Sequence, residues 1–307
     1  MSRSSSRPLK IGLLLPDTEG QMNGLTARWS DLLAMTKLAE DVEFDSVWVT
    51  DHFIHRSETE LRGPWECWSL LSAIAAVTKT VEIGPLVLCA GFRNPALLAK
   101  MADTVEEISG GRLILGLGAG WNEPEYRAFG YPFDNRFARF EEALTIISGL
   151  LRNGHIDFDG RFYQARDCEL RPRGPRPAGP PIMIGTTGKK MLDLTARHAD
   201  QWNVWFSPIE NSVEKLKTLL DDVDAACQSV GREPSTLVRS AAVKVEVGPH
   251  SPSQMSVAPL RGNPAELAAQ LRAYADIGVT HLQVWLEPNT IAGIEAFGRV
   301  LEELDRA

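Results

Sequence analysis

The sequence predicts an α/β domain folded as a (β/α)8 TIM barrel, with an insertion before the fifth strand. Short apolar runs that end in Gly, Pro, Asp or Asn alternate with stretches of helical periodicity along the chain. Eight such runs occur, whereas a doubly wound sheet usually stops at about five or six strands. Runs such as Ile11 to Leu15 are continuously apolar, which suits a parallel sheet covered on both faces.

The predicted strands are these apolar runs, taken in chain order: Lys10 to Leu15, Ser46 to Thr50, Val81 to Leu88, Leu113 to Gly118, Ile182 to Ile184, Trp202 to Phe206, Ala241 to Val247 and His281 to Leu286. Helices are predicted between and after them, at about residues 26–40, 67–76, 95–108, 136–151, 191–198, 212–229, 264–277 and 291–304. Asn94 and Asn263 each precede a proline, so a capping side chain stands before a residue whose missing N–H costs nothing at the first helical position. Gly278 follows the helix that begins near Pro264, where glycine is favoured.

Residues 153–181 interrupt the alternation. Asp159-Gly160 lies between Ile-Asp-Phe and Arg-Phe-Tyr, which predicts a hairpin with a two-residue turn. The proline-rich stretch 171–181 that follows cannot continue a helix or a central strand. We interpret the segment as an insertion that either crosses the surface or covers part of the barrel mouth, and we expect residues 1–307 to form one domain.

Composition excludes several classes of protein. With 44% hydrophobic and 23% charged residues, the chain has enough apolar material for a core, so it is not a disordered chain. The net charge is −8 and the basic residues are scattered, so nucleic acid is not an expected partner. No stretch resembles a signal peptide or a membrane span, and the four cysteines have no metal-ligand spacing. We expect a cytoplasmic protein.

Functional groups in such a barrel collect where strands end and lead into helices. The second strand closes with Asp51-His52-Phe53. A histidine there can donate a hydrogen bond or transfer a proton near neutral pH, or it can be tied to a carboxylate for structure alone. The fourth strand leads into Gly118 and Gly120, which permit close approach of a ligand to the backbone or fit a tight turn, and the spacing is not the dinucleotide fingerprint.

The fifth strand leads into a loop with phosphate-binding chemistry, made of Gly185, Thr186, Thr187 and Gly188 and followed by two lysines. Backbone N–H groups at a helix start, hydroxyls and ammonium groups suit a phosphate, although a capped turn with solvated lysines has the same sequence. The spacing of a P-loop is missing, so nucleoside triphosphate chemistry is not indicated. Large rings such as Trp202, Trp205 and Trp285 would wall a planar ligand or belong to the core. The histidines show no metal-binding motif, so no metal site is expected.

Taken in order, these motifs resemble the luciferase-like flavin oxidoreductases, and more closely their coenzyme F420-dependent branch. The resemblance covers nearly the whole chain and is carried by residues 44–53, 92–100, 109–125 and 199–203. It implies a (β/α)8 barrel that binds F420 or, as the alternative, FMN. It also implies a homodimer formed through helices near the start of the barrel, for which the apolar helix from Cys67 is a candidate unless it packs on the barrel instead.

The resemblance also assigns roles to residues. His52 would lie beside the isoalloxazine-type ring, Gly118 and Gly120 would line the ring pocket, and the loop 185–188 would receive the cofactor phosphate. A non-prolyl cis peptide, forming a bulge behind the ring, is expected near Leu86-Val87. Asp51 and Trp202 complete the predicted cofactor-binding set, and Trp202 is expected to wall an apolar chamber together with Trp121 and Trp205.

The chain departs from the family in one respect. In the family's sugar-phosphate dehydrogenases a proton-donating Glu follows the fourth-strand glycines, whereas Trp121 stands at that position here, so glucose-6-phosphate oxidation is not expected. Glu123 or Glu125 would supply a carboxylate from the same loop, unless they point into solvent or cap the following turn. The candidate catalytic residues are His52, Trp121 and Glu125.

Three functions follow from this interpretation. The first is hydride transfer between F420 and a small organic substrate, in which the protein supplies position and polarity. The second is a two-component monooxygenase that receives reduced FMN from a separate flavin reductase. The third is a cofactor-binding protein without turnover.

Overall fold

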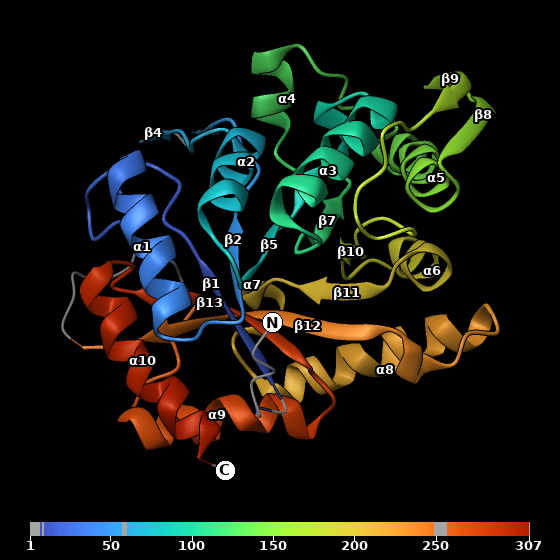
Figure 1. Ribbon diagram of the computed structural model, residues 1–307. Helices are drawn as coiled ribbons and strands as arrows, with labels where there is room; N and C mark the ends of the chain where they lie inside the picture. Colours follow the sequence, from blue (N-terminus) through green and yellow to red (C-terminus); the bar gives the residue numbers. More distant parts are fainter. Residues whose placement is uncertain (1–6, 8, 57–59, 249–256, 307) are drawn as a thin grey trace.

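A closed parallel sheet forms the centre of the protein (Figure 1). The computed structural model describes residues 7, 9–56, 60–248 and 257–306. The strands of the sheet are β1 (Lys10–Leu14), β2 (Ser46–Val49), β5 (Glu82–Pro85), β6 (Leu88–Cys89), β7 (Leu115–Gly118), β10 (Ile182–Gly185), β11 (Gln201–Val204), β12 (Val238–Glu246) and β13 (His281–Glu287).

The order of the strands shows how the barrel closes. Neighbours follow the order β5-β2-β1-β13-β12-β11-β10-β7-β6, and all pairs are parallel. The two ends of this order, β5 and β6, are the two halves of one interrupted strand. Ile83 of β5 also bridges Leu113, just before β7. The predicted (β/α)8 barrel is therefore confirmed.

The predicted helices surround this sheet: α1 (Trp29–Asp41), α2 (Cys67–Val77), α3 (Pro95–Ser109), α5 (Arg136–Asn153), α6 (Lys189–His198), α8 (Val213–Ser229), α9 (Pro264–Asp276) and α10 (Ile291–Asp305). The side chain of Asn94 caps α3 and that of Asn263 caps α9, as predicted. Trp68, Leu71 and Ile74 of α2 are buried, so this helix packs on the barrel. Across the described residues, none of the helices is long and apolar enough to cross a bilayer.

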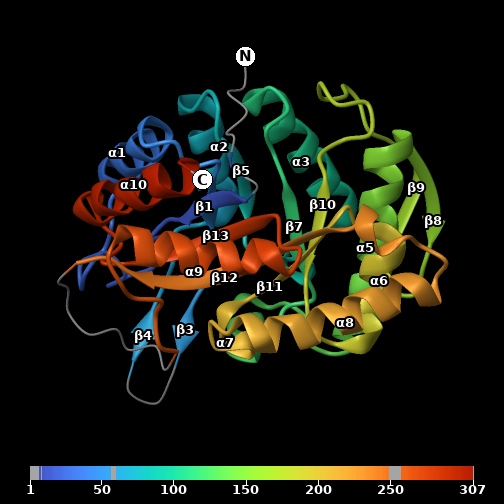
Figure 2. The same ribbon diagram turned by 90° about the horizontal axis from the view of Figure 1, so that it is seen from below.

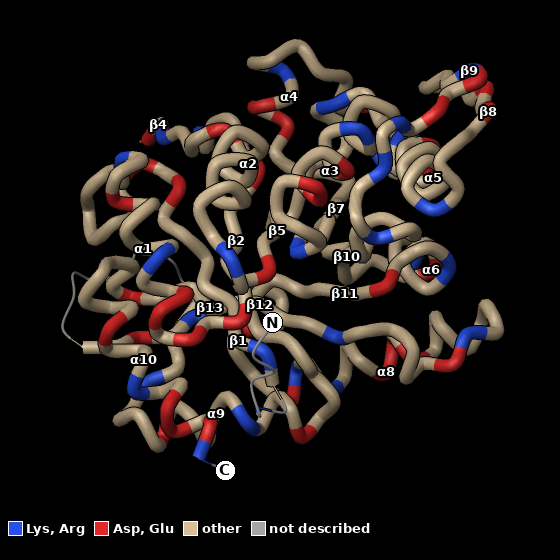
Figure 3. The backbone as a smooth tube through the Cα atoms, viewed as in Figure 1, with Lys and Arg blue, Asp and Glu red and all other residues tan. Residues whose placement is uncertain are grey.

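Short additional elements lie at the ends of the strands. They are β3 (His55–Arg56), β4 (Leu61–Arg62), η1 (Ala90–Phe92), α4 (Glu123–Phe129), α7 (Phe206–Ile209) and η2 (Pro234–Thr236). In the view of Figure 3, basic and acidic residues are interspersed over the helices. This distribution agrees with the scattered charge that the sequence predicts.

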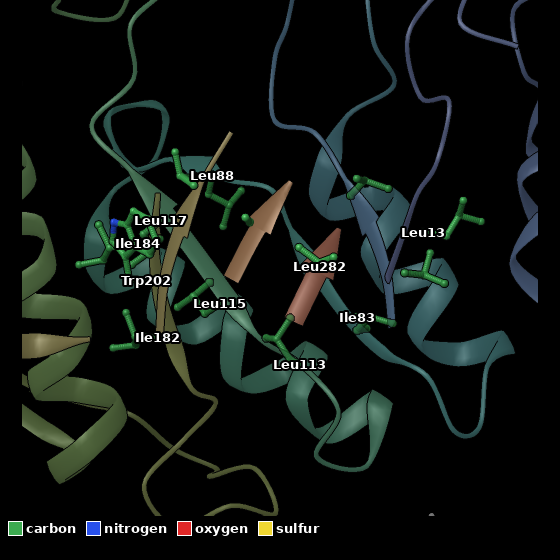
Figure 4. Packing of buried hydrophobic residues seen from close by; sticks show 14 of the residues in the cluster. Leu13, Ile83, Leu88, Leu113, Leu115, Leu117, Ile182, Ile184, Trp202 and Leu282 are labelled. Carbon is green, nitrogen blue, oxygen red and sulfur yellow. The ribbon is translucent and has the colours of Figure 1, made fainter. Parts of the chain in front are cut away.

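Alternate residues of each strand enter two different cores. One set packs between the sheet and the helices, where Figure 4 shows Leu117, Ile184 and Trp202 among the buried side chains. The other set fills the barrel interior and includes Trp48 and Met183. Because successive strand residues point to opposite faces, the register of each strand decides which side chains reach the interior.

Polar side chains fill the interior near the amino ends of the strands. The ring Nε2 of His281 lies 2.7 Å from the hydroxyl of Ser46, and the indole N–H of Trp48 donates to the same hydroxyl at 2.7 Å. Burial lowers the pKa of His281 to about 3, so this ring is neutral. The barrel interior is thus packed at the amino ends of the strands, so we expect a ligand site at the carboxyl ends, which form the rim.

The insertion contains the predicted hairpin but not the predicted turn. Strands β8 (His155–Asp159) and β9 (Gln164–Glu169) pair antiparallel, with Asp159 opposite Gln164, so residues 160–163 connect them and the two-residue turn is wrong. The carboxylate of Glu142, on α5, accepts hydrogen bonds from three backbone N–H groups of this connection, those of Arg161, Phe162 and Tyr163. A distant carboxylate therefore stabilises the longer loop.

The insertion crosses the outer surface and does not cover the barrel mouth. The hairpin lies outside α5 in both views (Figures 1 and 2). In the proline-rich part, Arg176 pairs with buried Glu106 of α3 and donates to the carbonyl of Leu113, which precedes β7. This part of the chain is therefore fixed at the amino end of the barrel.

Candidate functional site

His52 and Glu125 form a hydrogen-bonded pair at the carboxyl rim. His52 follows β2 and Glu125 lies in the first turn of α4, yet His52 Nδ1 is 2.9 Å from Glu125 Oε1. The other carboxylate oxygen accepts the backbone N–H of Phe53 at 2.9 Å. Glu125 is 1% exposed, so it neither points into solvent nor serves only as a cap. Although burial raises its pKa, the bonds from His52 and Phe53 outweigh this and lower the pKa overall.

This pairing sets the direction of the His52 ring. A carboxylate accepts hydrogen bonds, so Nδ1 carries the hydrogen and Nε2 remains available as an acceptor or as the site of proton transfer. Trp121 is 67% exposed, and its ring centroid lies 5.6 Å from that of His52. The three predicted catalytic residues are therefore neighbours.

His55 is a member of this group that the sequence prediction missed. Its ring centroid is 4.5 Å from that of His52. Burial and the adjacent His52 lower the pKa of His55 to about 4, so it is neutral at physiological pH. The spacing of the two histidines was the available signal, but it indicates no chemistry without the fold. Within the described ranges, no group of three or more His, Cys, Asp or Glu side chains is arranged to hold a metal ion.

Asp51 connects the end of β2 to β6 and to the segment that follows β6. Its carboxylate receives two hydrogen bonds from the guanidinium of Arg93, at 2.7 and 2.9 Å, and one from the N–H of Cys89 at 2.9 Å. Asp51 is 3% exposed, and Arg93 also pairs with Glu66, the cap of α2. These contacts give Asp51 a structural role directly beside His52.

Asp17 supports the same strand end from the other side. This buried carboxylate, which follows β1, accepts hydrogen bonds from the N–H and the hydroxyl of Thr50. Burial raises its pKa to about 6 despite these bonds. The sequence prediction missed both Asp17 and Arg93, because only the closed sheet brings them to residues 50 and 51.

The third barrel strand is broken by a cis peptide between Leu86 and Val87, where the resemblance places it. Three glycines of β7 and β10 leave room for the Val87 side chain. A Cβ added to Gly118 would lie 3.0 Å from a Val87 methyl group, and one added to Gly185 would lie 3.1 Å away. At Gly116 an added Cβ would lie 2.2 Å from the carbonyl oxygen of Pro85 and 3.0 Å from a Val87 methyl group. Glycine at these positions therefore allows the bulge to pack against β7 and β10.

Glycine is required at position 120 for a different physical reason. Its φ is +74°, and an added Cβ would lie 2.1 Å from the hydroxyl of Tyr126. The close packing of Tyr126 and Cys89 thus excludes a side chain here. This contact explains Gly120 without a ligand.

Residues 185–188, which we call the phosphate loop, lead into the uncapped start of α6. Gly188 is the N-cap residue, and no side chain accepts a hydrogen bond from the first turn. A Cβ added to Gly188 would meet nothing within 4 Å. Within the loop, the N–H of Thr186 donates to the carbonyl of Asn203 and the N–H of Gly188 donates to the Thr186 hydroxyl. The donors that suit a phosphate are therefore those in the first turn of α6, since N–H groups at a helix start attract anions.

Trp202 does not wall the pocket, so this prediction is wrong. Its ring is fully buried in the outer core beside Ile184 and Leu117 (Figure 4). Asn203 takes the inward position of β11, where its amide N–H donates to Ser240 and Gln283. The indole N–H of Trp202 donates instead to the carbonyl of Thr186 at 2.9 Å, so the ring supports the phosphate loop from behind.

Other rings occupy the interior side of the mouth. Trp205, Phe206 and Trp285 are in mutual contact, with ring centroids 4.3 to 6.1 Å apart. They pack in the same apolar cluster as Leu86 and Val87. The rim thus combines an apolar floor, an oriented histidine and an uncapped helix start, an arrangement that suits a planar ligand with an anionic group.

The comparisons with known proteins agree with this geometry. The family model described as luciferase-like monooxygenase matches residues 9–258. An F420-dependent glucose-6-phosphate dehydrogenase of Amycolatopsis mediterranei is 29% identical over 291 residues, which span 82% of this chain and 87% of the relative.

Two shorter matches represent both cofactor classes. A 5,10-methylenetetrahydromethanopterin reductase of Archaeoglobus fulgidus is 35% identical over 173 residues, covering 56% of this chain and 48% of the reductase. An FMNH2-dependent dimethylsulfone monooxygenase of Pseudomonas putida is 30% identical over 169 residues, covering 54% and 45%. The chain thus matches about half the length of these two relatives.

Solved structures show the same fold. An F420-dependent secondary alcohol dehydrogenase in complex with an F420-acetone adduct superimposes with a TM-score of 0.81 at 19% identity, covering 96% of this chain and 99% of the other. An EDTA monooxygenase from Chelativorans superimposes with a TM-score of 0.80 at 15% identity, covering 98% and 94%.

Proposed function

The chain belongs to the luciferase-like monooxygenase family, and on this premise we propose that it transfers a hydride between coenzyme F420 and a small organic substrate. One observation carries the proposal: His52, oriented by Glu125, stands at the rim that also carries the Leu86-Val87 bulge and the phosphate loop. Two relatives whose matches span 82% and 83% of this chain are named as F420-dependent glucose-6-phosphate dehydrogenases.

The residues at the rim fit this cofactor. Leu86 and Val87 offer an apolar surface for the ring, and the uncapped start of α6 offers backbone donors for the phosphate. When bound, F420 supplies the carbon that gives or accepts the hydride. The protein's own contribution is to hold the substrate against the ring and to manage its proton.

His52 is the residue that we assign to the proton. With Nδ1 bonded to Glu125, its Nε2 can accept a hydrogen bond from a substrate hydroxyl and take up that proton when the substrate is oxidised. In the opposite direction, protonated Nε2 donates to a substrate oxygen and stabilises the developing charge. Trp121 contacts this ring edge-on, with the ring centroids 5.6 Å apart.

The alternative is a monooxygenase that uses FMNH2 from a separate flavin reductase. The match to the dimethylsulfone monooxygenase favours it, and FMN carries a phosphate that the same loop would bind. We further propose that the protein is cytoplasmic and that it forms a homodimer. Size-exclusion chromatography with light scattering tests the homodimer by measuring the molar mass in solution.

A titration separates the cofactors. We expect F420 fluorescence to be quenched on addition of the purified apoprotein, with tighter binding than for FMN. Absence of quenching by F420, together with oxygen consumption in the presence of reduced FMN, would establish the alternative. His52→Ala tests the third hypothesis, because a catalytic role predicts a large loss of turnover with cofactor affinity retained, whereas a binding protein has no turnover to lose.

A further inference from the structure

A cavity of about 390 Å³ lies outside the barrel, between α5 and α6. Phe137, Glu141 and Thr145 of α5 line one wall. Lys190, Asp193, Leu194, Arg197 and His198 of α6 line the other. Residues three or four apart share one face of a helix, so each wall is a continuous helix face. The cavity is therefore a groove that follows the two helices.

The groove lies close to the phosphate loop in the chain, since Lys190, the first residue of α6 on its wall, follows Gly188 by two residues. Both helices start at the carboxyl rim, because α6 follows β10 and α5 comes after β7 in the chain. Lys190 lies two residues after Gly188, and its ammonium group is 5.7 Å from the ring centroid of Phe137 on the opposite wall. Arg197 lies seven residues further along α6, about 10 Å away at the helical rise. A chain leaving the loop would meet Lys190 first and Arg197 later.

The charged groups of the groove suit a peptide-like anion. In the described part of the chain, neither Lys190 nor Arg197 forms an ion pair, although both lie on the cavity wall. Glu141 and Asp193 add acceptors to the same walls. Burial and the charge of Arg197 lower the pKa of His198, so its ring is a neutral donor and acceptor. The groove thus offers cations for carboxylates and acceptors for amide N–H groups.

The two candidate cofactors differ at this position. FMN ends at its phosphate, whereas F420 continues beyond the phosphate into a lactyl group and a chain of γ-linked glutamates. That chain carries one carboxylate and one amide N–H for each linkage. A chain of this composition matches the mixed lining of the groove better than a simple anion does.

We propose that the groove between α5 and α6 binds the oligoglutamate tail of F420, with Lys190 and Arg197 contacting its carboxylates. The inference rests on the proposed function and goes beyond it, because it assigns cofactor selection to residues outside the barrel mouth. Glu141 and Asp193 accept the amide N–H groups of the tail. A flavin that stops at the phosphate gains nothing from these residues.

Binding measurements on two ligands test this assignment. The ligands are F420 with its full tail and a synthetic deazaflavin phosphate that ends at the phosphate, each titrated by fluorescence quenching. In the double variant Lys190→Ala/Arg197→Ala, we expect Kd for tailed F420 to rise about fivefold to tenfold, since two exposed charge contacts are lost. Kd for the truncated ligand should change less than about twofold. Added salt should weaken binding of the tailed ligand more strongly.

The control is Lys217→Ala, which removes an exposed lysine of α8 away from the groove and should leave both Kd values unchanged. An equal loss for both ligands in the double variant would place the two residues at the phosphate or in the fold, and would overturn the assignment. Unchanged binding of tailed F420 would overturn it as well. If the wild-type protein binds neither ligand, the proposed function itself fails, which is a separate result.

Discussion

Replacing Asp51 by Asn tests whether the rim is built on a buried ion pair. The Asp51 side chain is 1% exposed and that of Arg93 is 10% exposed, so the substitution leaves a largely buried guanidinium with Glu66 as its remaining charged partner. Breaking a buried pair by removing one member costs about 3 to 5 kcal/mol. Because Asn keeps the volume and one acceptor oxygen, we expect the lower limit, about 3 kcal/mol.

This free energy predicts a measurable shift in melting temperature. A chain of 307 residues has an unfolding entropy near 0.6 kcal/mol per kelvin at about 2.1 cal/mol/K per residue. A loss of about 3 kcal/mol therefore lowers Tm by about 5 °C. Urea unfolding followed by circular dichroism gives the free energy, and calorimetry gives Tm.

The control is Arg306→Ala, which removes two ion pairs, with Glu302 and Glu303, whose side chains are all at least 32% exposed. That variant should lose less than about 0.5 kcal/mol. The reasoning is refuted if Asp51→Asn keeps the wild-type stability while its Kd for the cofactor rises tenfold. Asp51 would then be a ligand contact, as the sequence resemblance suggests, and not a structural residue.

Three further outcomes are expected. Glu125→Gln should lower kcat about 10- to 100-fold with an unchanged cofactor Kd, because a hydrogen bond to a charged group that orients His52 contributes about 1.5 to 3 kcal/mol. The control Glu123→Gln changes an exposed residue of the same helix and should keep the wild-type kcat. Equal losses of kcat in both variants would contradict the positioning role of Glu125. The folded-state pKa of Asp17 is raised to about 6 from 3.8, so the contribution of Asp17 to stability is present below pH 4 and is lost as the pH rises through 6. The loss amounts to about 3 kcal/mol, and urea unfolding at pH values between 4 and 6 should show it. An Asp17→Asn variant with the same pH dependence would show that another group causes the loss. Trp202→Phe removes the hydrogen bond to the phosphate loop, so the free energy of unfolding should fall by about 1 to 2 kcal/mol and the Kd for FMN or F420 should rise a few-fold. A change in Kd without a loss of stability would show instead that the Trp202 ring contacts the cofactor.

The barrel could be predicted from sequence because its signals are local. The prolines after Asn94 and Asn263 mark helix starts through contacts within one helical turn, and both caps form as predicted. Apolar runs show where strands lie, since a strand covered on both faces excludes polar residues from either side. The same local information was insufficient at Asp159-Gly160, where Glu142 from a preceding helix stabilises a longer connection.

The candidate site could be predicted in part. The position of His52 and of residues 185–188 at the carboxyl rim could be predicted because they follow strands, and the barrel places the carboxyl end of every strand on one rim. Arg93 and Asp17 were missed because their partners lie 42 and 33 residues away along the chain, at distances that no local pattern encodes.

The sequence by itself determined which segments form strands and helices and which residue types reach the rim. Only the tertiary structure decided which faces these residues present and which residues they pair with. Trp202 and Asn203 are adjacent in one strand, and the register of the closed sheet turned the polar side chain inward and the ring outward. His52 and Glu125 are 73 residues apart in the chain, and only the folded barrel brings them within hydrogen-bond distance. The buried carboxylate of Glu125 needs hydrogen-bond donors, and the fold supplies them from a distant part of the chain.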